Sequence, residues 1–248
     1  MGRMAHLLVT GSSDGLGHGS AAALLDQGHD VVVHVRGEQR REAVAELVER
    51  GAGLLVADFG VRDDVLRAAR ELNEGGALDA VVHNAGVYSG APLIPVNVVA
   101  PYLLTALLEH PTRHVYLSSG MHRSGTASLD GIDWTGDRAT GTYADSKLLV
   151  TALSAAVARR SPGLFTASVD PGWVATKMGG PSAPDDFELG HRTQDRLAVG
   201  EGPESDVSGA HWHHDRRQQP EAAALDEAFQ DDLLAALEAA TGVTLPER

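Results

Sequence analysis

The chain has 248 residues, a formal net charge of −14 at neutral pH and no cysteine. This length suits one α/β domain with a large core. The acidic charge disfavours nucleic acid or an anionic membrane surface as the main partner, because both are bound through clustered lysine and arginine. The absence of cysteine excludes disulfides, thiolate nucleophiles and thiolate metal ligands.

The sequence indicates no membrane or export segment. No apolar run approaches the roughly 20 residues that span a bilayer, and residues 1–6 lead into a strand without a signal-peptide pattern. We therefore expect a cytoplasmic protein that has no membrane partner.

The first predicted elements are a short strand over residues 6–9, the glycine-rich stretch 10–17 (Thr-Gly-Ser-Ser-Asp-Gly-Leu-Gly) and a helix rich in alanine and leucine. Glycines at such a place let the backbone turn tightly and approach a pyrophosphate, whose charge the free N–H groups of the helix start can bind. A glycine-rich loop alone is often no more than a turn, so its meaning depends on the elements that follow.

Those elements alternate. Strands are predicted over residues 31–35, 54–57 and 78–82, with helices over 42–48 and 61–72. Strands that alternate with helices predict an α/β fold with a mostly parallel, doubly wound sheet of the Rossmann type, which binds its ligand at the carboxyl ends of the strands. We expect about seven strands in one domain that spans residues 1–248.

Two motifs carry a family resemblance. The spacing Thr-Gly-x-x-x-Gly-x-Gly at residues 10–17, and His83-Asn84-Ala85-Gly86 after the fourth strand, resemble the short-chain dehydrogenase/reductase family, in which the second motif reads Asn-Asn-Ala-Gly. The connection 87–96 is shorter than that family's. This shortening should alter the entrance to the site or the start of the helix that carries Asn97.

The fifth strand, residues 115–119, ends in two serines, and a later helix carries Tyr143 and Lys147. Residues four apart on a helix project from one face. A phenol has a pKa of about 10, so Tyr143 would serve as an acid–base group at neutral pH if the ammonium group stabilised its phenolate by roughly 3 pKa units. The resemblance implies that Ser119 polarises the substrate oxygen; Ser118 is the alternative.

The region around these residues is most similar to the retinol-dehydrogenase-like branch of the family. The similarity rests on residues 118–122 (Ser-Ser-Gly-Met-His), on residues 143–148 (Tyr-Ala-Asp-Ser-Lys-Leu) and on the 24 residues from Ser119 to Tyr143. The substrate of that branch is not carried over to this chain.

The last third contains a sixth strand, residues 164–169, and the stretch 170–176 (Asp-Pro-Gly-Trp-Val-Ala-Thr), which matches the family's Pro-Gly turn and downstream Thr beside the nicotinamide. Residues 179–202 lack apolar rhythm and predict a mobile loop over the substrate site. A final strand is expected within 207–212 and a C-terminal helix over 222–239. The histidines at 211, 213 and 214 lack an accompanying carboxylate motif, so we expect no metal site.

The resemblance implies an NAD(P)-dependent oxidoreductase that transfers hydride between a nicotinamide and a small carbonyl or alcohol substrate, with Tyr143 as general acid and base. Lys147 would also bind the nicotinamide ribose, and Asn97 would steady a water molecule. The alternatives are an epimerase or dehydratase of the same superfamily that retains its cofactor, and a non-catalytic regulator that senses the cofactor. By resemblance we expect a homodimer or homotetramer, formed through the helices that contain Tyr102 and Leu149.

The residues expected to bind the cofactor come from the ends of all these strands: Gly11, Ser12, Ser13, Gly15, Leu16, Gly17, Arg36, Asp58, Phe59, Asn84, Ala85, Gly86, Tyr143, Lys147, Pro171, Gly172, Val174 and Thr176. NADP is preferred over NAD. Val35 stands where NAD-specific enzymes carry an acidic residue, and the guanidinium of Arg36 could pair with a 2′-phosphate, with Arg40 and Arg41 close by. Asp14 stands where many NADP-preferring relatives carry a second basic residue, which weakens the preference.

Overall fold

The computed structural model describes residues 3–246, and its centre is a sheet of eight strands in the order β3-β2-β1-β4-β5-β6-β7-β8. The strands are β1 (His6–Val9), β2 (Asp30–Val35), β3 (Gly53–Val56), β4 (Ala80–His83), β5 (Arg113–Leu117), β6 (Phe165–Asp170), β7 (Ala210–His213) and β8 (Arg216–Gln218). All neighbouring strands are parallel except β7 and β8. The predicted doubly wound, mostly parallel fold is confirmed.

The strand count differs from the prediction of about seven by β8. This strand is exposed along its whole length and consists of Arg216, Arg217 and Gln218, so it has no apolar alternation that would mark it as a strand. Residues 1, 2, 247 and 248, which the predicted domain includes, lie outside the described residues.

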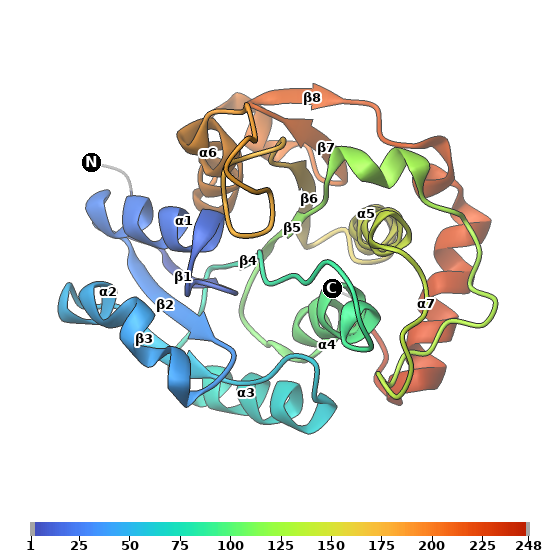
Figure 1. Ribbon diagram of the computed structural model, residues 1–248, viewed down its shortest axis with the longest axis horizontal. Coiled ribbons are helices and arrows are strands. Elements are labelled where there is room, and N and C mark those ends of the chain that lie inside the picture. The colour runs from blue at the N-terminus through green and yellow to red at the C-terminus, as the bar shows by residue number, and fades with distance from the viewer. Residues whose placement is uncertain (1–2, 247–248) are drawn as a thin grey trace.

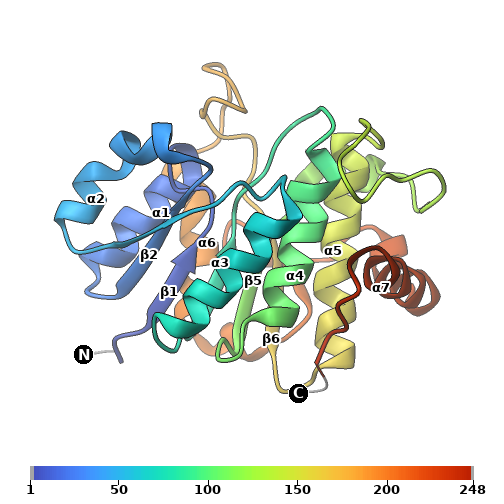
Figure 2. The ribbon, with the colours of Figure 1, turned by 90° about the horizontal axis from the view of Figure 1, so that it is seen from below.

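Helices cover both faces of the sheet (Figure 1). They are α1 (Gly15–Asp26), α2 (Ala45–Glu49), α3 (Arg62–Glu74), α4 (Ala100–Leu107), α5 (Tyr143–Arg160), α6 (Phe187–Val199) and α7 (Glu227–Thr241). α1, α2 and α6 pack on one face, and α3, α4 and α5 pack on the other. α7 packs on the outer side of α5, as Figure 2 shows from below.

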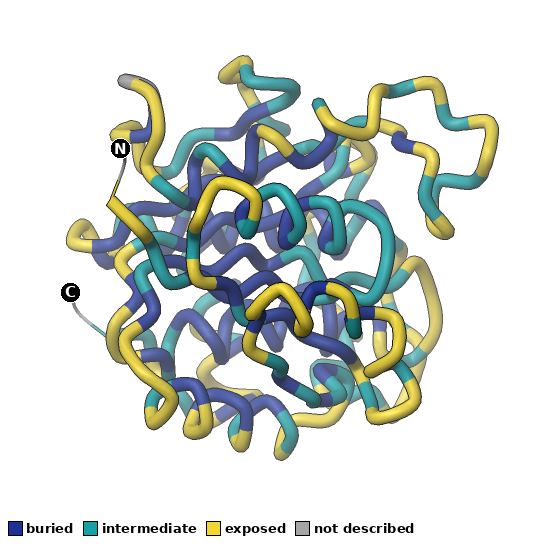
Figure 3. The backbone as a smooth tube through the Cα atoms, turned by 90° about the vertical axis from the view of Figure 1, so that its left-hand side faces the viewer, coloured by how far each residue is buried: buried dark blue, intermediate teal, exposed yellow. Residues whose placement is uncertain are grey.

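The alternation of strand side chains divides the core into two layers. In β1, Leu7 and Val9 point to the layer that contains Leu24 of α1, while Leu8 between them points to the layer that contains Leu149 of α5. Parallel strands buried on both faces read as continuous apolar runs, which is why the sequence marks them clearly. Figure 3 shows the buried strands inside a shell of exposed turns.

The helix that carries Tyr143 and Lys147 begins at a capping box. The Thr142 side chain accepts a hydrogen bond from the backbone N–H of Asp145, and the Asp145 side chain accepts one from the backbone N–H of Thr142. These bonds satisfy two N–H groups at the helix start and fix where the first turn begins. Tyr143 is therefore held at the first position of α5, next to the carboxyl ends of the strands.

Part of the predicted mobile loop 179–202 is a helix, so the loop prediction is wrong for residues 187–199. Asp186 caps α6, and Gly200 ends it in the left-handed region with φ 74°. Asp195 of α6 accepts a hydrogen bond from the Ser20 hydroxyl of α1 and lies 2.7 Å from Nδ1 of His191. These polar residues face the protein interior, so hydropathy alone conceals the helix. The mobility of residues 179–186 stays a prediction.

Other boundaries moved by a few residues. The strand expected within 207–212 is β7, Ala210–His213, and the helix expected over 222–239 is a 3₁₀ turn, Ala222–Leu225, followed by α7. α4 is preceded by a π-helical turn, Pro95–Val99, whose first two residues are the last two of the connection 87–96.

Tyr102 and Leu149, which mark the helices expected to form a dimer or tetramer, are buried within the chain. Tyr102 is 1% exposed and Leu149 is 0% exposed, and the Tyr102 hydroxyl donates a hydrogen bond to the Val243 carbonyl group near the C-terminus, at 2.5 Å. A contact between copies through α4 and α5 would therefore use other side chains of these helices. Self-association itself stays a prediction. Among residues 3–246, no helix is long and apolar enough to cross a membrane.

Candidate active site

The glycine-rich turn lies between β1 and β4, at the point where the strand order reverses. Gly11 has φ 69°, and a Cβ atom there would lie 2.8 Å from Cα of Ala85. Gly17 has no room for a side chain either, because a Cβ atom would lie 2.2 Å from Nδ2 of Asn84. Glycine at both positions is therefore required by the close approach of the two loops.

Asn84 holds the glycine turn and the loop after β4 together. Its amide donates hydrogen bonds to the carbonyl groups of Thr10 at 2.8 Å and Gly11 at 3.1 Å. The backbone N–H of Ala85 donates to the Thr10 hydroxyl at 2.9 Å. The glycine turn and the Asn84 motif thus form one hydrogen-bonded unit, although the sequence separates them by more than 70 residues.

A cavity of about 430 Å³ runs along this unit. Most of the residues expected to bind the cofactor line it: Gly11, Ser13, Gly15, Leu16, Arg36, Asp58, Phe59, Asn84, Ala85, Gly86, Tyr143, Lys147, Pro171 and Thr176. The expected Gly172 and Val174 line a second cavity instead. The expected Ser12 and Gly17 line neither cavity. The Ser12 hydroxyl instead donates a hydrogen bond to the Val9 carbonyl group within the turn, at 2.6 Å.

His34 is a lining residue that the sequence interpretation missed. Its Nδ1 accepts a hydrogen bond from the N–H of Gly11 at 2.9 Å, and its Nε2 donates to the Ala57 carbonyl group at 2.8 Å. Its ring stacks on Phe59 with centroids 4.0 Å apart. Burial lowers the pKa of His34 to about 4, so a neutral imidazole ties the glycine turn to β3.

The basic residues at the end of β2 differ in their positions. Arg36 is exposed and lines the cavity, and Arg40 also lines it, with its guanidinium 3.9 Å from the Asp14 carboxylate. Arg41 pairs with Glu38 and does not line the cavity. Lys177 reaches the same Asp14 at 2.8 Å. Asp14 therefore has two basic partners, and the cation nearest the end of β2 is Arg36.

Tyr143 and Ser119 meet at the carboxyl edge of the sheet. Burial is the main cause that raises the pKa of Tyr143 to about 12; a hydrogen bond with Ser119 opposes this shift, while the Asp170 carboxylate and Tyr88 add to it. The alternative Ser118 is engaged elsewhere, since its hydroxyl lies 2.7 Å from the Thr151 hydroxyl in the interior. Ser119 is thus the serine that faces the phenol.

Lys147 is 5% exposed, and its Nζ donates a hydrogen bond to the Leu117 carbonyl group at 2.8 Å. Nζ lies 5.4 Å from the centre of the Tyr143 ring. Burial lowers the pKa of Lys147 to about 8. The expected lowering of the phenol's pKa is not found. Burial raises the pKa of Tyr143 instead, and the ammonium group of Lys147 is bound to a carbonyl group.

Asn97 lies in the π-helical turn before α4 and does not line either cavity. Its side chain accepts a hydrogen bond from the N–H of Val87 at 2.9 Å and donates to the Val87 carbonyl group at 3.0 Å and to the Ser146 hydroxyl at 2.9 Å. These bonds link the start of the connection 87–96 to Ser146 of α5. Both N–H groups of the amide and one acceptor site of its oxygen are therefore used in binding protein groups.

A second cavity of about 680 Å³ lies on the other side of Tyr143. Its lining combines Ser119 and Tyr143 with residues 170–174, Thr176, residues 178–179, Tyr88 and Met121. Tyr88 stacks on Tyr143 with centroids 4.8 Å apart. The structure thus joins Ser119, Tyr143 and Lys147 at the boundary of two cavities. In the described residues, no group of three or more His, Asp or Glu is arranged to hold a metal ion.

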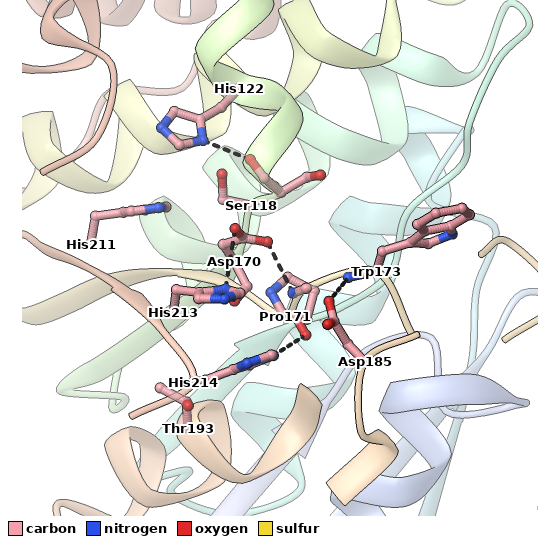
Figure 4. Close-up of polar contacts among 12 residues, drawn as sticks. Ser118, His122, Asp170, Pro171, Trp173, Asp185, Thr193, His211, His213 and His214 are labelled. Carbon is pink, nitrogen blue, oxygen red and sulfur yellow. Dashed lines mark hydrogen bonds and ion pairs between the residues drawn. The ribbon is translucent and has the colours of Figure 1, made fainter. Parts of the chain in front are cut away.

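His122 supports Ser119 from the side opposite the cavity. Its Nδ1 donates to the Ser119 carbonyl group at 2.6 Å, which is the dashed line at His122 in Figure 4. Its Nε2 accepts from the N–H of Glu221 at 3.0 Å. Both ring nitrogens are used, which fixes the neutral tautomer. This residue was interpreted only as part of a family pattern, and its position three residues after Ser119 is the signal that could have revealed its role.

Comparison with known proteins relates the whole chain to one family. The model of the short chain dehydrogenase family matches residues 5–105. Short-chain dehydrogenase chyC of Penicillium rubens is 37% identical over 258 aligned residues, which cover 98% of this chain and 100% of the relative.

Solved structures share the fold. A protein from Mycobacterium paratuberculosis has a TM-score of 0.79 at 23% identity, with 98% of this chain and 95% of that chain covered. A short chain dehydrogenase from Escherichia coli CFT073, complexed with NADPH, has a TM-score of 0.68 at 20% identity, with 87% of this chain and 98% of that chain covered.

Proposed function

Because the chain belongs to the short-chain dehydrogenase/reductase family, we propose that it is an NADP-dependent oxidoreductase that interconverts a carbonyl compound and the corresponding alcohol. The observation that carries this proposal is the position of Tyr143, which lines both the 430 Å³ and the 680 Å³ cavities. A cofactor in the first cavity and a substrate in the second would meet at its hydroxyl group.

The first cavity fits a dinucleotide. Gly11, Gly15 and Gly86 line it without side chains. The start of α1 points its free N–H groups at this surface, which suits a pyrophosphate. Arg36 at the mouth favours a 2′-phosphate and hence NADP, and the NADPH complex of the Escherichia coli neighbour agrees with this preference.

The reaction in the reductive direction is carbonyl compound plus NADPH plus a proton, giving alcohol and NADP⁺. The bound cofactor supplies the hydride. Tyr143, whose pKa of about 12 keeps it protonated at neutral pH, donates the proton to the substrate oxygen as that oxygen gains charge. The Ser119 hydroxyl holds the same oxygen in place.

The remaining residues prepare this proton transfer. Lys147 places a buried cation beneath the phenol and offers N–H donors to the cofactor's ribose. The Asn97 side chain braces the connection 87–96 against Ser146, and the water molecule expected at Asn97 stays a prediction. The retinol-dehydrogenase-like branch and the cytoplasmic location stay predictions.

The test is a panel of ketones and aldehydes with NADPH and NADH, followed by absorbance at 340 nm and by product analysis. We expect stoichiometric NADPH oxidation and alcohol formation with at least one neutral aromatic ketone. Isomerised or dehydrated product without net cofactor oxidation would indicate an epimerase or dehydratase. Tight NADPH binding without any turnover would indicate a regulator that senses the cofactor.

A further inference from the structure

Asp170 places a carboxylate beside the proposed catalytic groups. It is the last residue of β6, whose Val169 is in register with Leu117 of β5, two residues before Ser119. A Cβ atom on Gly120 would lie 3.1 Å from Oδ2 of Asp170, so the carboxylate lies against the residue that follows Ser119. Its side chain is 14% exposed and lines the 680 Å³ cavity.

The acceptor capacity of Asp170 is only partly used. Oδ1 accepts a hydrogen bond from the N–H of Gly172 at 3.0 Å, and Oδ2 lies 3.3 Å from Nδ1 of His213 (Figure 4). The same His213 nitrogen is 3.2 Å from the backbone carbonyl oxygen of Asp170, which shares it. An ionised carboxylate can accept about four hydrogen bonds. Asp170 therefore keeps room for a donor from a bound molecule.

Asp185 is the other carboxylate that lines this cavity. Its Oδ2 accepts a hydrogen bond from the N–H of Trp173 at 2.6 Å. A Cβ atom added to Gly172 would lie 2.5 Å from the same oxygen. It holds the turn at 172–173 and faces backbone. Of the two carboxylates, Asp170 is the one that lies next to Ser119, because it packs against Gly120.

The cavity has no basic side chain that would neutralise an anion. Among the described residues that line it there is no lysine or arginine, and His213 is the single histidine. The nearest catalytic cation, Lys147, lines the other cavity and is bound to Leu117. The net charge of −14 adds an unfavourable long-range potential for an anionic substrate.

The walls of the cavity are apolar. Four large side chains that line it are between 42% and 58% exposed: Tyr88, Met121, Trp173 and Met178. Aromatic and thioether side chains at an open cavity bind apolar rings and adapt to their shape. A molecule that fills this space would therefore have an apolar body.

We propose that Asp170 selects the substrate: carbonyl compounds with an apolar body that carries a protonated amine are preferred, and those that carry a carboxylate or phosphate are rejected. The proposal rests on the proposed function and names its substrate class. The geometry gives the ammonium group a charge-assisted hydrogen bond to the free side of the carboxylate while the carbonyl oxygen lies between Ser119 and Tyr143. The same carboxylate opposes ionisation of the phenol, which keeps Tyr143 in its proton-donating form.

The experiment compares kcat/KM for four acetophenones of matched size, which carry aminomethyl, hydroxymethyl, methyl or carboxylate at position 3, with NADPH as reductant. For the wild type we expect the order aminomethyl, hydroxymethyl, methyl, carboxylate, with the amine favoured over the methyl compound by roughly tenfold or more. Asp170→Asn should reduce this ratio to near one and improve the relative rate of the carboxylate.

Two further variants keep the result interpretable. Asp232→Asn makes the same chemical change on the exposed side of α7, so its ratios should equal those of the wild type. Asp170→Glu retains the charge and should retain the sign of the preference. If Asp170→Asn does not fold, the proposal is tested by two remaining results: the amine-to-methyl ratio of the wild type and the sign of the preference in Asp170→Glu.

Equal rates for the amine and methyl compounds in the wild type, or a preference for the carboxylate, would overturn the proposal while leaving the carbonyl reductase function intact. A preference for the amine that survives in Asp170→Asn would also overturn it. If none of the four compounds is reduced, and the wider panel is not either, the proposed function fails and this inference fails with it.

Discussion

The two cavities that meet at Tyr143 are built from different kinds of contact. The cofactor-side cavity is lined by groups already hydrogen-bonded to one another, such as Asn84 to Gly11 and His34 to Gly11. The substrate-side cavity is lined by exposed apolar side chains, such as Trp173 at 58% and Tyr88 at 55%, while its hydrogen bonds, such as those of Asp170 to Gly172 and of Asp185 to Trp173, hold the turn after β6. One side has its geometry fixed by the fold, and the other leaves its side chains free to vary.

This difference explains why only one side carries a family motif. A backbone cradle needs glycine at fixed places, because a Cβ atom on Gly11 or Gly17 would meet Ala85 or Asn84 at less than 3 Å. An apolar cavity wall needs only a side chain of suitable size. The cofactor side can therefore be recognised from spacing, whereas the substrate side becomes visible only when the strands bring residues together.

The largest effect is expected at the boundary of the two cavities. Tyr143→Phe removes the proton donor with little change in volume, so turnover should fall by about a hundredfold to ten-thousandfold while NADPH affinity changes little. Steady-state rates and a fluorescence titration of NADPH measure the two effects separately.

Tyr102→Phe is the matched control, since it removes a buried hydroxyl that bonds to Val243 and lines neither cavity. It should retain activity. Activity of Tyr143→Phe that equals this control would contradict the assigned role of the phenol.

A smaller effect is expected at the mouth of the cofactor side. Arg36→Ala should weaken NADPH binding roughly tenfold to a hundredfold, the value of one charge-assisted contact, with NADH binding little changed. Calorimetric titration of both cofactors gives the ratio. Arg41→Ala, which loses only the pair with Glu38, should change neither affinity; an equal loss for NADPH and NADH in Arg36→Ala would show that the 2′-phosphate lies elsewhere.

Most strands and part of the candidate site could be predicted from the sequence. The strands β1 to β6, the glycine turn, Ser119 and Tyr143 follow from apolar runs and spacing, because parallel strands are buried on both faces. α6 was missed because its inward side chains are polar: Gln194 and Asp195 bond to Ser20 of α1 instead of entering an apolar core. β8 was missed because every residue of it is polar and exposed.

Individual site residues were missed for a related reason. His34 stands inside an apolar run and was counted only as strand, yet its alternation with Val33 and Val35 places it on the opposite face of β2. Asp170 precedes the recognised Pro-Gly turn, but its role depends on Gly120 and His213, which come from other parts of the chain. Such contacts across the sheet have no signature in local sequence.

The smallest predicted effect concerns stability on the cofactor side. The pKa of Lys147 is lowered by burial to about 8 from 10.5, so the folded protein binds its proton less tightly than the unfolded chain. The charged form therefore costs stability at pH 7, and this cost disappears as the pH rises from about 8 to above 10.

Lys147→Met should accordingly be more stable than the wild type at pH 7 by on the order of 2 kcal/mol, after the lost bond to Leu117 is counted, although it should be inactive. Urea unfolding at pH 7 and pH 10 measures the difference, which should narrow at the higher pH because the wild type gains stability there. A variant that is less stable at pH 7 by a similar amount would mean that the ammonium group is well compensated where it lies.

The central claim is that hydride passes from a cofactor in the first cavity to a carbonyl carbon in the second. The direct measurement uses NADPH deuterated on both hydrogens at C4 of the nicotinamide and analyses the alcohol product by mass spectrometry and NMR. The account predicts one deuterium per product molecule, located on the carbinol carbon. Product that carries hydrogen from solvent at that carbon would contradict direct transfer between the two cavities.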